Sequence, residues 1–293
     1  MRRVAFQGEP GAFGHAAVHA VFPRDEALPC LTFEETIAAV KSGAAELAMV
    51  PVENSLYGRI TDIHHLLPES GLFIIGEHYH RVRLCLLGVP GAKLSGVKTV
   101  QSLSVALGQC RKFIARHGLR TVSGVDTAGS AREVAERADK SVAAIASRLA
   151  GEIHGLEVLA PDIEDADHNT TRFLVMSPEK LEAPPGPGVK TTFVFRVRNV
   201  PAALYKAMGG FATNAVNMTK LESYMLDGSF TATQFYADIE GHPTDIGVRH
   251  AMEELGFFTD HVKILGVYPA GKPGDGGSRP ASPPTAPRPR KRR

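Results

Sequence analysis

Residues that could do chemistry gather in one stretch near the middle of the chain, residues 165–176, which reads DADHNTTRFLVM. Two adjacent hydroxyl side chains, Thr170 and Thr171, and the guanidinium of Arg172 come directly before an apolar run of strand length. Polar groups at the end of a rigid sheet element are typical of a functional site. The same composition is also ordinary for a solvated loop before a core strand.

A second polar stretch follows another predicted strand. Residues 47–50 are an apolar run of strand length, and we expect Pro51 to end it because proline cannot donate to an interior ladder. Glu53, Asn54 and Ser55 would then lie just past the strand's carboxyl end, where open α/β sheets bind ligands. The alternative for these three side chains is helix capping of the following segment, and capping is compatible with ligand contact.

Both stretches resemble signatures of one enzyme family. Residues 169–173, NTTRF, resemble the Thr-Arg-Phe signature of prephenate dehydratases, and residues 51–55, PVENS, with Gly58 resemble that family's second signature. Residues 191–269 resemble the ACT regulatory domain that such enzymes carry. The resemblance therefore covers nearly the whole chain apart from its tail.

The resemblance implies that prephenate, a cyclohexadienol with two carboxylates, loses water and carbon dioxide to give phenylpyruvate, with no cofactor. Because the ring becomes aromatic, the site needs aimed hydrogen bonds more than covalent chemistry. Thr171 is the candidate donor to the departing hydroxyl, and Arg172 the candidate carboxylate or orienting partner. Arg172 has a structural alternative, as the ion-pair partner of Glu53 or Asp167.

The remaining expected contacts come from several elements. Glu53 is assigned a catalytic role, positioning Thr171 or binding polar groups of the substrate, and Phe173 is expected to pack the cleft floor. The glycine-rich turn at residues 7–14 suits either carboxylate binding at a helix start or a purely structural turn. The residues expected to contact substrate are Asn54, Ser55, Asn169, Thr170, Phe173, Ser102, Thr127 and Ser147.

The order of predicted elements indicates an α/β fold. Strands alternate with helices up to about residue 180, which favours mainly parallel sheets with helices on their faces. We expect a two-lobed catalytic domain at residues 1–180, similar to type II periplasmic binding proteins. Residues 181–190 are rich in proline and glycine and read as a linker. Residues 191–269, with a hairpin at Asp227-Gly228, predict a ferredoxin-like βαββαβ ACT domain.

The regulatory segment keeps half of each motif that the resemblance implies for phenylalanine binding. A Gly-Ala-Leu-type loop is matched by Ala202-Ala203-Leu204, and a Glu-Ser-Arg-Pro segment by residues 222–225, ESYM. Alanine at 202 is costly if the backbone there has a positive φ. We expect phenylalanine to bind as an effector between subunits of a homodimer or homotetramer, at Ala203, Leu204, Asn217, Glu222 and Ser223.

Composition bounds the partners and the compartment. The chain has a net charge of +2, but residues 271–293 carry seven basic side chains against one acidic, so the rest carries −4. An acidic body argues against nucleic-acid binding over the fold, and residues 270–293 read as a disordered basic tail. Three cysteines without C-x-x-C spacing fit reduced thiols, and no apolar run is long enough for a membrane span. We therefore expect a cytoplasmic protein.

Other readings stay open. Arogenate dehydratase is an enzymatic alternative, and a two-lobed small-molecule sensor is a non-enzymatic one; retention of Thr171 and Arg172 favours catalysis over sensing. Two histidine groups, residues 64–65 and 78–80, invite a metal interpretation. No further ligand type lies at a recognisable spacing, so we predict no metal site.

Overall fold

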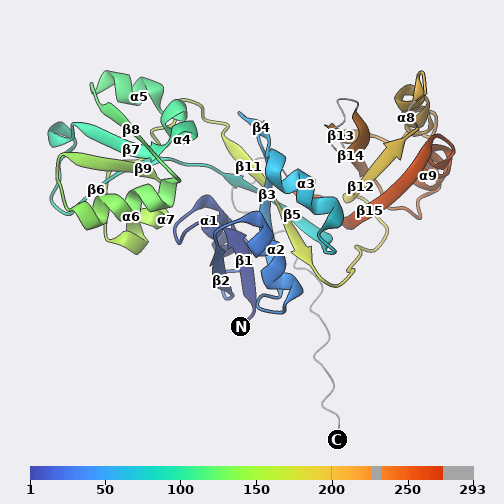
Figure 1. Cartoon of the computed structure of the whole chain (residues 1–293), viewed down its shortest axis with the longest axis horizontal. Coiled ribbons are helices and arrows are strands. Elements are labelled where there is room, and N and C mark those ends of the chain that lie inside the picture. Colours follow the sequence, from blue (N-terminus) through green and yellow to red (C-terminus); the bar gives the residue numbers. More distant parts are fainter. Residues whose placement is uncertain (199, 226–231, 273–293) are drawn as a thin grey trace, which may run out of the picture. The chain divides into compact units, whose positions relative to one another are not determined.

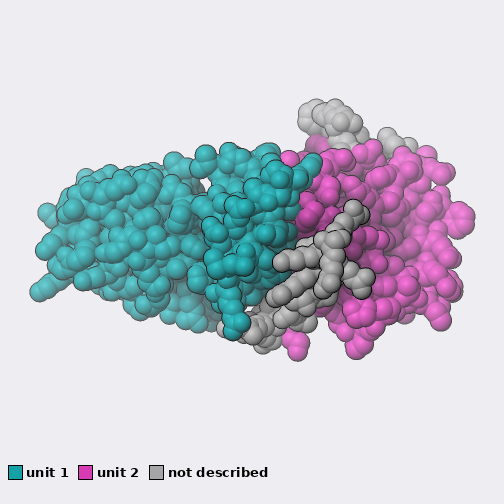
Figure 2. All heavy atoms as spheres, turned by 90° about the horizontal axis from the view of Figure 1, so that it is seen from below, with its two compact units in different colours: residues 1–63, 78–173, 273–278 teal, residues 64–77, 174–272, 279–293 magenta. Residues whose placement is uncertain are grey.

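The computed structural model describes residues 1–198, 200–225 and 232–272. The hairpin expected at Asp227-Gly228 and the tail from residue 273 lie outside these ranges. The chain divides into two compact units, coloured separately in Figure 2. Of the described residues, 1–63 and 78–173 form the first unit, and 64–77 and 174–272 form the second. The division is discontinuous, because strands β5 (Phe73–Arg81) and β11 (Thr170–Ser177) each belong partly to both units.

The first unit contains two α/β lobes, whose strands belong to two different sheets (Figure 1). In the first lobe, β1 pairs in parallel with both β2 and β3, and β3 pairs antiparallel with β4. Its strands are β1 (Arg3–Gln7), β2 (Glu26–Cys30), β3 (Leu47–Asn54) and β4 (Gly58–Arg59), and its helices are α1 (Phe13–Val21) and α2 (Phe33–Lys41). Helix α3 (Thr61–Leu66) and a 3₁₀ helix (Leu67–Glu69) follow.

The second lobe has a five-stranded sheet of order β10-β6-β9-β7-β8. Strand β7 is parallel to β8 and β9, while β6 is antiparallel to β9 and β10. The strands are β6 (Cys85–Gly88), β7 (Thr99–Leu103), β8 (Arg120–Gly124), β9 (Val142–Ala146) and β10 (Glu157–Ala160). The helices are α4 (Ser104–Gln109), α5 (Arg111–Arg116), α6 (Thr127–Arg137) and α7 (Arg148–His154), with a 3₁₀ helix at Leu94–Gly96.

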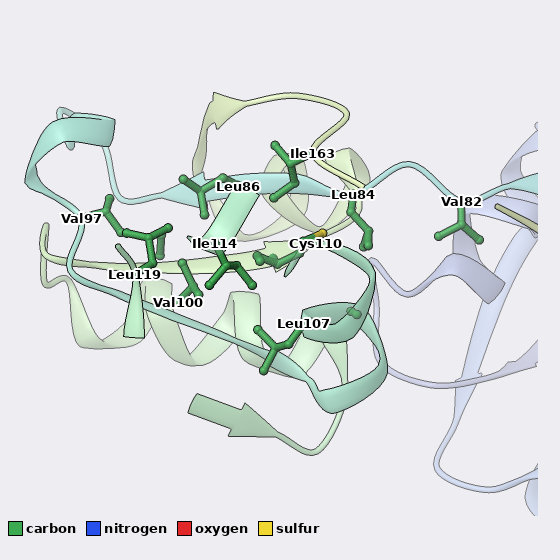
Figure 3. Close-up of a cluster of buried hydrophobic side chains, with 13 residues drawn as sticks. Val82, Leu84, Leu86, Val97, Val100, Leu107, Cys110, Ile114, Leu119 and Ile163 are labelled. Atoms are coloured by element: carbon green, nitrogen blue, oxygen red, sulfur yellow. The ribbon is translucent and has the colours of Figure 1, made fainter. Parts of the chain in front are cut away.

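A core of branched aliphatic side chains holds helices α4 and α5 against this second sheet. Val100 of β7 and Ile145 of β9 are fully buried, and Leu107 and Ile114 pack onto them from the two helices. Figure 3 shows this cluster with Cys110 at its centre. The expected mixed α/β architecture with parallel pairing is therefore confirmed for the first unit.

The prediction that Pro51 ends a strand is wrong. Strand β3 continues through Pro51 to Asn54. Its ladder with β1 involves only Leu47, Ala48 and Met49. The missing N–H of Pro51 therefore breaks no hydrogen bond to β1. Glu53 and Asn54 are consequently the last two residues of the strand rather than the first residues after it.

The second unit holds an antiparallel sheet of order β13-β14-β12-β15, with β15 also pairing in parallel with the Ile74 region of β5. Its element order is the predicted βαββαβ, and Phe193, Phe195 and Phe211 pack between sheet and helices. The elements are β12 (Val189–Val197), α8 (Ala203–Thr213), β13 (Met218–Met225), β14 (Ala232–Glu240), α9 (Ile246–Phe258) and β15 (Thr259–Pro269). Because β12 begins at Val189, the expected linker 181–190 is two residues too long.

A buried ion pair ties residues 64–77 to this sheet. Lys190 Nζ of β12 lies 2.7 Å from Glu77 Oε1 of β5, and the Glu77 side chain is fully buried. The backbone N–H of Gly271 donates to the same carboxylate oxygen at 2.8 Å. These charge-assisted bonds satisfy a carboxylate that would otherwise be costly to bury.

Among the helices of the described ranges, none is long and apolar enough to cross a membrane.

Ala202, at the start of helix α8, has a positive φ, the costly case for an alanine at this position. Its φ is +62° and its ψ +17°, the left-handed conformation, and no side chain caps the helix there. A Cβ makes this conformation costly by about 1–2 kcal/mol, whereas glycine adopts it freely.

Replacing Ala202 by glycine should therefore raise the free energy of unfolding by about 0.5–1 kcal/mol, since relieved strain exceeds the added entropy of the unfolded chain. Urea denaturation measures this change. As a matched control, Ala212→Gly inside helix α8 should lower the free energy of unfolding by a similar amount. Destabilisation of both variants alike would contradict the role assigned to the backbone angle.

Candidate functional site

Asn54 at the end of β3 joins the two polar stretches through its side-chain amide. Its Nδ2 donates to Thr171 Oγ1 at 3.0 Å and to Asn169 Oδ1 at 2.9 Å. Its Oδ1 accepts from the backbone N–H groups of Leu56 and Tyr57, at 2.9 and 3.2 Å. Both ends of the amide are thus assigned by their partners. The expected helix capping is not seen, because residues 55–57 form a turn before β4; Asn54 instead holds that turn while it contacts the Thr-Arg-Phe segment.

The Thr171 hydroxyl is buried and accepts a hydrogen bond from Asn54. Thr171 is 8% exposed and Asn169 is fully buried. Because Thr171 Oγ1 accepts a hydrogen bond from Asn54, its own proton is directed elsewhere. Asn169 Nδ2 is buried and has no hydrogen-bond partner among the described residues. A buried donor of this kind is ordinarily satisfied by water or a ligand.

Ser55 fixes the loop before β11. Its Oγ donates to the carbonyl of His168 at 2.8 Å and accepts from the N–H of Thr170 at 3.0 Å. Its backbone N–H donates to the carbonyl of Thr170 at 2.9 Å. Ser55 therefore holds Thr170 from both sides, which positions the strand start.

Arg172 is paired with Glu53 across the two strands, the first of the two ion-pair partners considered for it. Arg172 Nη1 lies 2.9 Å from Glu53 Oε1. The Arg172 side chain is 3% exposed and that of Glu53 is 29% exposed. The other partner considered, Asp167, has a fully exposed side chain. A buried guanidinium with a carboxylate partner is strongly held in place.

An open cavity of about 550 Å³ lies beside this ion pair. Strand alternation explains its composition, because Thr170 and Arg172 face it while Thr171 and Phe173 face the other side of β11. Tyr79 and Arg81 of β5 also line it and were not predicted, although their spacing of two places them on one strand face. The lining residues are Glu53, Asn54, Ser55, Tyr79, Arg81, Asp167, His168, Thr170 and Arg172.

Phe173 is buried in the sheet, behind the Thr171 cluster. It is 2% exposed, and its ring packs edge-on against His80 with the ring centres 6.3 Å apart. Burial, and then the nearby His78, lowers the pKa of His80 to about 4. His80 is therefore uncharged at neutral pH and adds no cation here. Within the described ranges, no group of His, Cys, Asp and Glu is arranged to hold a metal ion.

The three hydroxyl residues predicted from the second lobe are buried at the ends of elements of that lobe. Ser102 is fully buried and donates to the Ile145 carbonyl at 2.5 Å. Ser147 caps helix α7, and its Oγ donates to the Gly11 carbonyl at 2.6 Å. Thr127 is the first residue of α6 and is 9% exposed. The protons of Ser102 and Ser147 are already engaged, and substrate contact by all three stays a prediction.

The glycine-rich turn lies against the second lobe. Gly11 has a φ of +96°, and a Cβ there would lie 2.6 Å from Ala150 Cα. Glu9 forms an ion pair with Arg132 of α6 at 3.0 Å, and this hydrogen bond lowers the pKa of the Glu9 carboxyl. These contacts favour the structural role of the turn.

The residues predicted to bind an effector lie in the second unit. Ala203 is 6% exposed within the core of the βαββαβ module, and Leu204 packs against that core. Asn217 donates to Glu240 at 3.1 Å, and Glu222 accepts from Lys220 at 3.1 Å. Ser223 lies opposite Phe235 in the ladder of β13 with β14.

Comparison with known proteins relates most of the chain to one family. The family model of prephenate dehydratase matches residues 4–181. The bifunctional N-acyl-homoserine lactone acylase/prephenate dehydratase of Komagataeibacter europaeus is 55% identical over 271 residues, covering 92% of this chain and 96% of that protein. The chloroplastic arogenate dehydratase/prephenate dehydratase 1 of Arabidopsis thaliana is 36% identical over 281 residues, covering 91% and 72%.

Solved structures agree with these relationships. The crystal structure of prephenate dehydratase in complex with L-Phe from Arthrobacter aurescens has a TM-score of 0.84 and 30% identity, covering 96% of this chain and 92% of that one. A structure described as GqqA, a novel type of quorum quenching acylase, has a TM-score of 0.88 and 54% identity, covering 92% and 98%.

The ion pair between Glu53 and Arg172 should be the most costly contact of the site to break. Glu53→Gln leaves a buried guanidinium without its carboxylate, and we expect a loss of about 2 kcal/mol in the free energy of unfolding, reduced from the fully buried case by the exposure of Glu53. The control Arg83→Gln breaks an exposed ion pair with Asp162 and should cost less than about 0.5 kcal/mol. Equal losses in chemical denaturation would refute the assignment.

Proposed function

Because the chain belongs to the prephenate dehydratase family, we propose that it converts prephenate to phenylpyruvate in phenylalanine biosynthesis. The members of this family are lyases. The observation that carries the proposal is the hydrogen bond from Asn54 to Thr171, which leaves the threonine proton available to a leaving hydroxyl group. Family signatures that are 117 residues apart in the chain meet at this bond.

The proposed reaction breaks two bonds of the substrate. The ring carboxylate leaves as carbon dioxide, and the electron pair of its C–C bond moves into the ring. The C–O bond on the opposite side breaks, and the departing oxygen takes the proton of Thr171 to form water. Solvent then returns a proton to Thr171, whose hydroxyl is too weak an acid to stay ionised. Aromatisation supplies the driving force, so proton assistance and positioning are what the protein contributes.

The polar groups around Thr171 have distinct proposed tasks. Asn54 orients the threonine, and Asn169 Nδ2 offers a donor to a substrate oxygen. Arg172 and Glu53 act together as a positioning pair, because the charge of Arg172 is already balanced. Ser55 and Thr170 line the cavity on the other side of β11, so we assign them to fixing the start of the strand that carries Thr171.

Removal of the threonine hydroxyl should slow the chemical step. Thr171→Ala is expected to lower kcat by about 10²- to 10⁴-fold, the range for losing proton assistance, with a much smaller change in substrate binding. Thr171→Ser keeps a hydroxyl and should recover most of the loss. Thr121→Ala removes an exposed threonine from β8 and should leave kcat unchanged. Wild-type turnover by the Thr171→Ala variant would exclude the proposed role.

Arogenate is a second candidate substrate, since a plant relative that is 36% identical to this chain is named as an arogenate dehydratase/prephenate dehydratase. It carries an amino group where prephenate has a keto group. Purified protein incubated with each compound separates the two, because prephenate gives phenylpyruvate and arogenate gives phenylalanine. Formation of neither product would favour the small-molecule sensor and would refute both dehydratase activities.

Hydrolysis of N-acyl-homoserine lactones is a second candidate activity. It is proposed because the bacterial relative named for that activity is 55% identical over 96% of its own length. The test adds an N-acyl-homoserine lactone to the same protein and measures released homoserine lactone. Thr171→Ala distinguishes one shared site from two, since it would abolish both activities or only the dehydration.

Regulation by phenylalanine is proposed for the second unit. Support comes from its βαββαβ topology and from the relative solved in complex with L-Phe. We assign binding to Ala203 and Leu204 at the start of α8, to Asn217 just before β13, and to Glu222 and Ser223 of β13, at a contact between two copies of the chain.

Calorimetric titration should show phenylalanine binding that weakens when a substrate analogue is present. Linkage requires this reciprocity if phenylalanine inhibits by binding one state of the protein more tightly. Sedimentation in the same buffers should show a dimer or tetramer. Absence of phenylalanine binding would reduce the module to an assembly element, and equal affinity with and without the analogue would exclude coupling.

A further inference from the structure

A second cavity of about 580 Å³ lies elsewhere in the first unit, among helix α1, helix α7 and the end of β5. Thr171, Asn54 and Asn169 are not among the residues that line it. One wall is apolar, formed by Phe13 and Ala16 of α1 together with Leu149 of α7. The volume is in the range of small-molecule sites in proteins.

Three guanidinium groups also line the cavity, and two of them have N–H groups available to a ligand. Arg83 is bridged to Asp162 at 3.3 Å. Arg81 has a buried Nε without a hydrogen-bond partner within the described ranges. Arg148 is exposed, and the described chain offers its guanidinium no hydrogen bond or ion pair. A buried donor without a partner is unfavourable, and an anion bound beside Arg81 would supply the missing acceptor.

The surrounding charges select the kind of anion. Glu152 and Asp162 also line the cavity, so its surplus of positive charge is small and disfavours a dianion such as phosphate. A single planar carboxylate matches the fork of a guanidinium. The apolar wall requires that the same molecule carry a hydrophobic part.

We propose that this cavity binds a small amphipathic monocarboxylate, with its carboxylate held by Arg81 and Arg148 and its apolar part against Phe13, Ala16 and Leu149. Carboxylates with an aromatic side group, such as phenylpyruvate, and medium-chain fatty acids share this chemistry. Arg81 also lines the cavity beside Arg172, whereas Arg148 lines only this one. Arg148 is therefore the residue whose substitution isolates the proposed site.

Calorimetric titration of the full chain with sodium octanoate and, separately, with phenylpyruvate tests the proposal without using turnover. Arg148→Gln should weaken binding of the preferred probe by at least about 10-fold, the effect of losing one charge-assisted contact. Ala16→Leu, which fills the apolar side, should weaken it comparably. Arg116→Gln removes an exposed charge at the end of α5 and should leave binding unchanged.

The outcomes separate the ligand sources and the two cavities. If phenylpyruvate also occupies the Thr171 site, wild-type protein shows two binding events, and Arg148→Gln loses only one of them. Whichever probe binds more tightly identifies the source as aryl or acyl. The proposal is overturned if neither probe binds at concentrations up to about 10 mM, because a dissociation constant above that concentration would mean no specific site. Binding that is the same in the wild-type, Arg148→Gln and Ala16→Leu proteins also overturns it.

Discussion

The buried charge of Arg172 is the constraint on which the site depends. A guanidinium that is 3% exposed requires a carboxylate, and Glu53 supplies it from the neighbouring polar stretch. Side chains alternate along a strand, so a contact between Glu53 and Arg172 on one face places Asn54 beside Thr171 on the other. A slip of one residue in either strand would separate both pairs at once. The ion pair therefore sets the position of the hydroxyl group that we assign to catalysis.

Much of this site was predictable from the sequence because most of its polar residues lie in two short segments of the chain. The motif residues 53–55 and 169–172 did meet, and the pairing of Arg172 with Glu53 was one of two options. Pro51 misled the prediction of the strand end, since proline is excluded only where a ladder partner needs its N–H. Tyr79 and Arg81 were missed because a strand next to a motif carries no signal of which of its faces borders a cavity.

Contacts between distant residues account for the rest of what the sequence did not reveal. The backbone carbonyls that engage Ser102 and Ser147 belong to Ile145 and Gly11, and no local pattern encodes such partners. The same holds for Lys190 and Glu77, which lie 113 residues apart and form a buried pair in the second unit. Topology predicted from element order succeeded there, because βαββαβ follows from alternation and turn spacing alone.

The buried amide N–H of Asn169 favours a ligand that brings an oxygen acceptor to it. Its Oδ1 is committed to Asn54, so rotating the amide would exchange one unmet need for another and bring Nδ2 against Nδ2. In the folded chain Nδ2 therefore depends on water or a ligand for its hydrogen bond, and a ligand that excludes water without replacing that bond incurs a cost of about 1–3 kcal/mol. A substrate oxygen placed beside Thr171 would avoid that cost, and an analogue without an acceptor there would not. The buried amide thus contributes to selectivity as well as to affinity, because a poor ligand incurs the penalty.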